Sequence, residues 1–150
     1  MMDVVIKSAE RSDINGISIL FDAYRVFYGK PSNIELAAKF IEARIQNQDS
    51  EIVYAMTDDT NYIGFIQLYP IFSSVSANKV WVLNDLFILK AFREKNVARN
   101  MISEVHSLAS ESGIKEVRLC TEVDNSVARK IYESMGYKPV NNFRFYSKSL

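Results

Sequence analysis

The chain has 150 residues, with 18 basic and 18 acidic side chains, five glycines and one cysteine. This length buries one sizeable core, so a single domain over residues 1–150 is expected. The 48% hydrophobic content excludes a disordered chain, and no apolar run approaches the roughly 20 residues that span a bilayer. Without a signal-peptide pattern, and with Cys120 too isolated for a disulfide or zinc site, we expect a cytoplasmic protein with no membrane partner and no metal. Zero net charge argues against a nucleic-acid partner.

Hydrophobic periodicity predicts a mixed order of strands and helices along the chain. The expected strands are 4–6, 51–56, 62–69, 80–89, 116–122 and a last one near 143–148. The expected helices are 13–28, one that opens with a capping box at 32–35, 97–110, and one that begins at 124 or 125 and ends at 135. Ser12 or Asp13 is expected to cap the first helix, and residues 72–77 are expected to form a loop.

This order predicts the topology of the sheet. The strand–helix–strand unit over 80–122 predicts a right-handed crossover between parallel strands. The hairpin region 62–89 is expected to be antiparallel. An α/β (α+β) fold with a mixed, mostly antiparallel sheet and helices on both faces follows.

The turn after the long strand is rich in basic residues: Lys90, Arg93, Lys95 and Arg99, against the single acid Glu94. It leads into a helix, whose first turn offers unpaired backbone N–H groups and the positive end of the helix dipole, an arrangement suited to a pyrophosphate. Asn96 tolerates left-handed backbone, and Ala98 keeps the surface small. A solvated turn that merely joins two elements explains the same charges equally well.

Two motifs in this region resemble those of the GCN5-related N-acetyltransferases (GNAT). The pattern V-x-x-x-x-[RQ]-x-x-G-x-[GA], which binds acetyl-CoA in that family, is matched by Ile88, Arg93 and Ala98, with Asn96 in place of the central glycine. The pattern N-x-x-A-x-x-x-Y-x-x-x-G-[FY] is matched at every fixed position by residues 125–137. The resemblance is strong over 80–137 and implies a GNAT fold with six to seven strands and a splayed parallel strand pair.

The resemblance implies which residues bind the cofactor acetyl-CoA. Main-chain groups at the end of the long strand would contact the pantetheine amides and acetyl group, and N–H groups of the turn would hold the pyrophosphate. The second motif adds contacts, although a plain helix cap also explains its asparagine. The expected cofactor residues are Phe87, Ile88, Leu89, Arg93, Glu94, Lys95, Asn96, Val97, Ala98, Arg99, Asn125, Ala128 and Tyr132.

Three residues are candidates for catalysis: Tyr132, Asp85 and Asn84. The Tyr132 hydroxyl would protonate the leaving thiolate of coenzyme A, although an aromatic residue at helical spacing also suits a core position. Asp85 could accept the proton of the attacking amine, but strand alternation would turn it away from Asn84 unless a β-bulge intervenes. A chain of water molecules to solvent is an equally good proton acceptor, with Asn84 positioning a water or the acceptor.

The acceptor would be a small-molecule amine, or a peptide, bound near the first helices and the loop before the long strand. The expected contacts are Tyr24, Tyr28, Gln67 and Ser74, although the helical spacing of the two tyrosines favours a core position over an acceptor contact. His106 and Cys120 have the surroundings of structural residues rather than of catalytic ones. A homodimer is also expected, with the apolar segment 143–146 pairing strands across an interface.

The zero net charge conceals a division along the chain. Residues 1–89 carry 7 basic and 11 acidic side chains, and residues 90–150 carry 11 basic and 7 acidic ones. The acidic half would receive the acceptor, which favours a cationic amine. Two other functions remain open: an acyl-CoA sensor or partner module of the same fold with little turnover, and, more remotely, a nucleic-acid module that uses the basic turn.

Overall fold

The computed structural model describes residues 2–58 and 60–150. The chain forms two compact units, Met1–Cys120 and Thr121–Leu150, and each is described by itself. The first unit holds a five-stranded sheet, and the second holds one helix. Whether the two units act as a single domain stays a prediction. In the parts of the chain that the structure describes, no helix is long and apolar enough to cross a membrane.

The sheet has the strand order β1-β2-β3-β4-β5. Its strands are β1 (Val4–Ser8), β2 (Glu51–Thr57), β3 (Asn61–Ser73), β4 (Asn78–Ile88) and β5 (Val117–Leu119). The first four pair antiparallel, and β4 pairs parallel with β5. The mixed, mostly antiparallel sheet is therefore confirmed, and the described residues form five strands rather than the expected six or seven.

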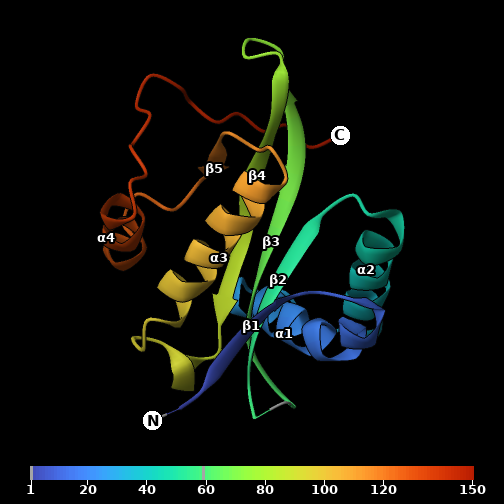
Figure 1. Cartoon of the computed structure of the whole chain (residues 1–150). Helices are drawn as coiled ribbons and strands as arrows, with labels where there is room; N and C mark the ends of the chain where they lie inside the picture. The colour runs from blue at the N-terminus through green and yellow to red at the C-terminus, as the bar shows by residue number, and fades with distance from the viewer. Residues whose placement is uncertain (1, 59) are drawn as a thin grey trace. The chain divides into compact units, whose positions relative to one another are not determined.

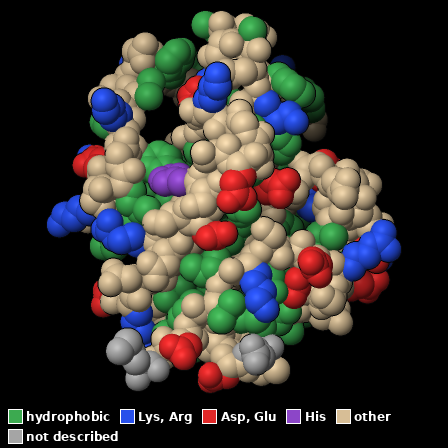
Figure 2. Space-filling view, viewed as in Figure 1, with side chains coloured by type: hydrophobic (Ala, Val, Ile, Leu, Met, Phe, Trp, Pro, Cys, Tyr) green, Lys and Arg blue, Asp and Glu red, His purple; other side chains and the backbone are tan. Residues whose placement is uncertain are grey.

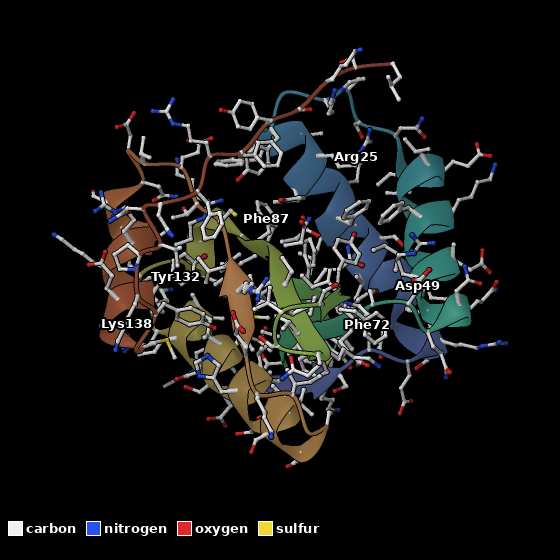
Figure 3. The ribbon with its side chains drawn as sticks, turned by 90° about the horizontal axis from the view of Figure 1, so that it is seen from above. Arg25, Asp49, Phe72, Phe87, Tyr132 and Lys138 are labelled. Carbon is white, nitrogen blue, oxygen red and sulfur yellow. The ribbon has the colours of Figure 1, made fainter. Side chains whose placement is uncertain are left out.

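Helices lie on both sides of this sheet, as predicted. The first unit contains α1 (Ile14–Phe27), α2 (Ile34–Asn47) and α3 (Val97–Glu111), with short 3-10 turns η1 (Arg11–Asp13) and η2 (Lys90–Phe92). Figure 1 shows α3 in front of the sheet, and Figure 3, viewed from above, shows α1 and α2 on the opposite side. The core between the sheet and the helices α1 and α2 consists of these buried side chains: Ile17, Leu20, Phe21, Ala37, Ile41, Ile52, Tyr54, Met56, Phe65 and Phe87.

The N-terminal ends of α1 and α2 are capped differently from what the sequence predicts. The capping box at 32–35 is wrong: Asn33 is the N-cap of α2 and accepts from the Leu36 N–H at 3.0 Å. The Ser32 hydroxyl donates instead to Asp22 on α1, at 2.7 Å, and thereby ties the two helices together. Asp13 precedes α1, but its carboxylate accepts from the Glu10 N–H and the Tyr62 hydroxyl instead of capping that helix.

The second unit contains α4 (Ser126–Ser134), followed by a tail without a further helix or strand. The strand expected near 143–148 is wrong, because the described residues after α4 form no strand. The apolar residues Phe143 and Phe145, whose alternation suggested a strand, are exposed, so they bury no surface against a sheet that would stabilise strand pairing. The homodimer expected through this segment stays a prediction.

Candidate active site

The end of β4 lies beside a parallel neighbour that stops early. Pairing between β4 and β5 covers only Trp81–Val117 to Leu83–Leu119, whereas β4 continues to Ile88 against β3. The parallel pair therefore separates past Leu83, as the resemblance implied. Phe87 and Ile88 are buried at the end of this strand, and Leu89 is half-buried where the turn begins.

The turn after β4 has the backbone conformation that its asparagine predicted. Asn96 adopts left-handed backbone, with φ 61° and ψ 7°, directly before α3, and Glu94 is also left-handed with φ 61°. The side chains of Arg93, Glu94, Lys95 and Arg99 are exposed, Ala98 is half-buried and Val97 is buried beneath the helix start.

The start of α3 lacks the side-chain cap that two other helices have. Asn33 and Asn125 cap α2 and α4 through their side-chain oxygens, whereas the Asn96 side chain makes no capping hydrogen bond. The first turn of α3 also carries no acidic residue. The positive end of this helix therefore remains available to an anion that approaches the turn.

Arg93 ties this turn back to the strand it leaves. Its Nε donates to the Ile88 carbonyl oxygen at 2.8 Å. Its guanidinium carbon lies 5.5 Å from the centre of the Phe27 ring and 5.7 Å from that of the Phe87 ring. The side chain of Arg93, the arginine that matches the motif, therefore makes contacts within the protein and is turned toward α1.

A β-bulge in β4 brings Asp85 and Asn84 together. Gln67 on β3 pairs with Asp85 and the next residue, Leu68, pairs with Leu83, so the pairing skips Asn84. The Asn84 side-chain amide donates to Asp85 Oδ1 at 3.0 Å, and the Gln67 amide donates to Asp85 Oδ2 at 3.1 Å. The carboxylate is thus held by two neutral amides while only 5% of the residue is exposed.

Two tyrosine hydroxyls feel the charge of this carboxylate. Burial, and after it the negative charge of Asp85, raises the pKa of Tyr24 far above its usual range. The same two causes raise the pKa of Tyr69 to about 12. Both phenols therefore stay protonated at neutral pH, so they can donate hydrogen bonds beside a group suited to accept a proton.

The residues expected to bind the acceptor fall at different places. Tyr24 lies beside Asp85, and Tyr28 is 58% exposed at the end of α1. Gln67 is fully buried: its amide N–H donates to Asp85, and its amide oxygen accepts from the Ser50 hydroxyl, so its side chain is engaged within the protein. Ser74 lies in the turn of the β3–β4 hairpin, at the top of Figure 1. Since a strand rises about 3.3 Å per residue, this turn lies roughly 20 Å from the Gln67–Asp85 pair.

The second motif lies in the second unit. Asn125 accepts from the Ala128 N–H at 3.1 Å and thus caps α4. The half-buried Tyr132 lies on this helix with its ring 5.9 Å from that of Tyr137. Burial, and the neighbouring Tyr132, raises the pKa of Tyr137 to about 12.

Two contacts of the site were not predicted from the sequence. The ring of Phe27 against Arg93 joins residues 66 positions apart in the sequence, and Ser50 completes the hydrogen bonds of Gln67. The sequence places Phe27 at the end of the first expected helix, but nothing in its spacing points to a cationic partner.

Other chemistry-bearing residues lie elsewhere. His106 lies on α3, where Figure 2 shows it in purple, and burial lowers its pKa. Cys120 is exposed. Over residues 2–58 and 60–150, no three His, Cys, Asp or Glu side chains are grouped to hold a metal ion. On the face in Figure 2, basic and acidic side chains are intermixed rather than gathered in one basic patch.

Comparisons with known proteins identify the class. The model of the acetyltransferase (GNAT) family matches residues 17–137. The chain is 39% identical over 141 residues to the uncharacterized N-acetyltransferase YhfO of Bacillus subtilis (strain 168), covering 94% of each. A crystal structure of a probable acetyltransferase has a TM-score of 0.89 and 36% identity, with 97% of each chain covered. The complex of AAC(6')-Iy with the bisubstrate analogue CoA-S-monomethyl-acetylneamine has a TM-score of 0.82 at 21% identity, with 99% of each chain covered, and shares the fold.

The chain belongs to the acetyltransferase (GNAT) family, and it is an acyltransferase. The uncapped start of α3 and the separated end of β4 are the parts of its fold that lie at the family's first motif.

Proposed function

We propose that this enzyme transfers an acetyl group from acetyl-CoA to a primary amine of a small molecule or peptide. The observation that carries the proposal is the left-handed Asn96 before the uncapped start of α3. A glycine normally supplies this conformation, and here an asparagine supplies it without closing the helix end with its side chain. The residues of the turn therefore fit the anionic pyrophosphate of coenzyme A.

The cofactor would supply a thioester, which makes the acetyl group reactive toward an amine. Backbone groups of 87–89 would hold the pantetheine and acetyl carbonyl, and N–H groups of 93–99 would hold the pyrophosphate. Asn125 and Ala128 would add contacts from α4. This assignment rests on the two motifs together with the conformation of the turn.

Two side chains would handle protons in a direct attack without a covalent enzyme intermediate. The Tyr132 hydroxyl would donate a proton to the departing thiolate. The Asp85 carboxylate would take up the proton of the attacking amine, and the Asn84 amide would orient that carboxylate. The bulge supports this pairing of roles because it brings both β4 side chains into hydrogen-bonding contact.

The proposed acceptor is a cationic amine that reaches the end of α1. Tyr24 and Tyr28 would line its path, and Asp85 would attract its charge. The acidic balance of residues 1–89 supports the same choice. A solved neighbour in the fold holds an analogue that joins CoA to acetylneamine, so aminoglycoside fragments belong in the first panel of acceptors.

Two measurements test the proposal: calorimetry with CoA, and release of free thiol from acetyl-CoA across a panel of amines. Tyr132→Phe should bind CoA as the wild type does and lose about 100-fold or more in kcat. Tyr137→Phe, which removes a neighbouring hydroxyl from the same unit, should retain kcat.

The outcomes separate the alternatives. An unchanged kcat in Tyr132→Phe contradicts the role of that phenol. Tight CoA binding without thiol release from any amine favours an acyl-CoA sensor of the same fold. Absence of CoA binding refutes the proposal itself.

A further inference from the structure

The aromatic ring that ends α1 lies against the arginine of the cofactor-binding turn. Phe27 is the last residue of α1, and 62% of it is exposed. Its ring centre lies 5.5 Å from the Arg93 guanidinium carbon and 6.2 Å from the centre of the Phe87 ring. Figure 3 shows Phe87 on the side of the sheet that faces α1. The exposed Phe27 ring therefore covers one side of the Arg93 guanidinium.

One hydrogen bond and two aromatic rings hold the guanidinium of Arg93 at the end of β4. Its Nε is bound to the Ile88 carbonyl oxygen, which fixes the root of the guanidinium. The Arg93 residue is exposed, so water competes for this hydrogen bond, and rotation about the aliphatic bonds of the side chain can carry the whole guanidinium away from Ile88. Phe87, only 8% exposed, forms a rigid wall on the core side, and Phe27 is the second ring against the same cation.

We propose that Phe27 is a positioning residue for the cofactor-binding turn and acts through Arg93. Its ring keeps the guanidinium directed at the end of β4, so that the turn at 89–96 retains the conformation that presents the start of α3 to the cofactor. This inference rests on the proposed function in one respect only, namely that the turn binds coenzyme A.

The arrangement also connects the two substrates. Phe27 is in contact with Tyr28, at a ring distance of 5.3 Å, and Tyr28 is a proposed acceptor residue. A change at the end of α1 therefore alters the affinity for coenzyme A as well as for the amine. Two short paths join the acceptor tyrosines to Arg93: Tyr28 reaches it through the exposed Phe27, and Tyr24 reaches it through the buried Phe87.

The first test is the dissociation constant of CoA, measured by calorimetry on the enzyme without acceptor. Phe27→Leu should weaken CoA binding about 2- to 5-fold, the value of one exposed cation–π contact. Phe27→Trp should bind CoA as tightly as the wild type does, because the indole ring also makes a cation–π contact with Arg93. Phe72→Leu is a matched control: its exposed ring lies 5.7 Å from Lys79 in the β3–β4 hairpin, and its removal should leave CoA binding unchanged.

A double-mutant cycle with Arg93→Ala tests whether Phe27 acts through the arginine. In the Arg93→Ala background, Phe27→Leu should have no further effect on CoA binding. Thermal unfolding of each variant confirms that the protein is folded, since Phe27 is exposed and its loss opens no cavity.

Each outcome decides one point. If the wild type fails to bind CoA, the proposed function fails. If the wild type binds CoA and Phe27→Leu binds it equally well, or if the two substitutions add independently, the positioning role of Phe27 is overturned and the proposed function stands.

Discussion

The left-handed conformation of Asn96 predicts opposite effects of one substitution at two sites. Asn96 has φ 61° before α3, whereas Asn100 is an exposed residue within the helix. Replacement by alanine removes the same side chain from both. At position 96 alanine must keep a conformation that an L-residue adopts at a cost, and at position 100 alanine is the best helix former.

The magnitudes follow from these two backbone conformations. Left-handed backbone costs an ordinary L-residue about 1–2 kcal/mol, part of which asparagine avoids, so Asn96→Ala should lower the free energy of unfolding by about 1 kcal/mol. Asn100→Ala should raise it by about 0.6 kcal/mol, the difference in helix propensity. For a chain of this length each kcal/mol corresponds to about 2–4 °C in Tm.

Urea unfolding and thermal unfolding of the two variants measure these differences directly. Asn96→Gly should leave the free energy of unfolding unchanged or raise it by up to about 1 kcal/mol, because the relief of backbone strain competes with the greater conformational freedom of the unfolded chain. It should also keep CoA binding. Shifts of the same sign and size in Asn96→Ala and Asn100→Ala would refute the assigned conformation of the turn.

Two further predictions concern the packing of α1. Hydrogen bonds from the Ser32 hydroxyl and the Asn33 N–H lower the pKa of Asp22 below its usual 3.8. The Asp22 contribution to stability is therefore complete above about pH 4 and lost as the pH falls through the lowered pKa. Asp22→Asn should lower the free energy of unfolding by about 1–3 kcal/mol at pH 7. Urea unfolding at a series of pH values should show that the difference between wild type and variant becomes smaller in acid. Gly16→Ala places a Cβ against the Tyr62 ring and should cost about 1–3 kcal/mol, while Asn15→Ala should be tolerated; equal Tm values would contradict the packing.

Much of the fold is predictable because strand and helix periodicities are strong over most of the chain. Residues 97–110 show one apolar face, and α3 ends one residue later. The antiparallel pairing of 62–89 and the parallel crossover to β5 follow from order and loop length alone. The strand predicted near 143–148 is absent because the alternation of Phe143 and Phe145 is not sufficient by itself: a strand also needs a neighbouring strand to pair with.

The candidate site was predicted less evenly. Asn96 in a left-handed position is a local property of a residue type, and the sequence showed it. The contact between Phe27 and Arg93 depends on where α1 ends relative to the β4 turn, which is a tertiary property. Likewise, Ser32 and Glu35 fit a capping box by spacing, but Asp22 competes for the serine hydroxyl and the cap moves to Asn33.

The position of Asp85 shows most clearly why side-chain identity alone does not define this site. In a regular strand Asn84 and Asp85 would point to opposite faces. Since the pairing with β3 skips Asn84, the carboxylate receives the Gln67 amide across the sheet and the Asn84 amide from its own strand. The bulge also leaves the charge near the Tyr24 and Tyr69 hydroxyls, whose pKa values it raises. A carboxylate so held is buried without losing its hydrogen bonds, so the cost of taking it out of water is partly offset. The register of one hairpin, rather than the presence of an acid, therefore makes Asp85 the candidate proton acceptor.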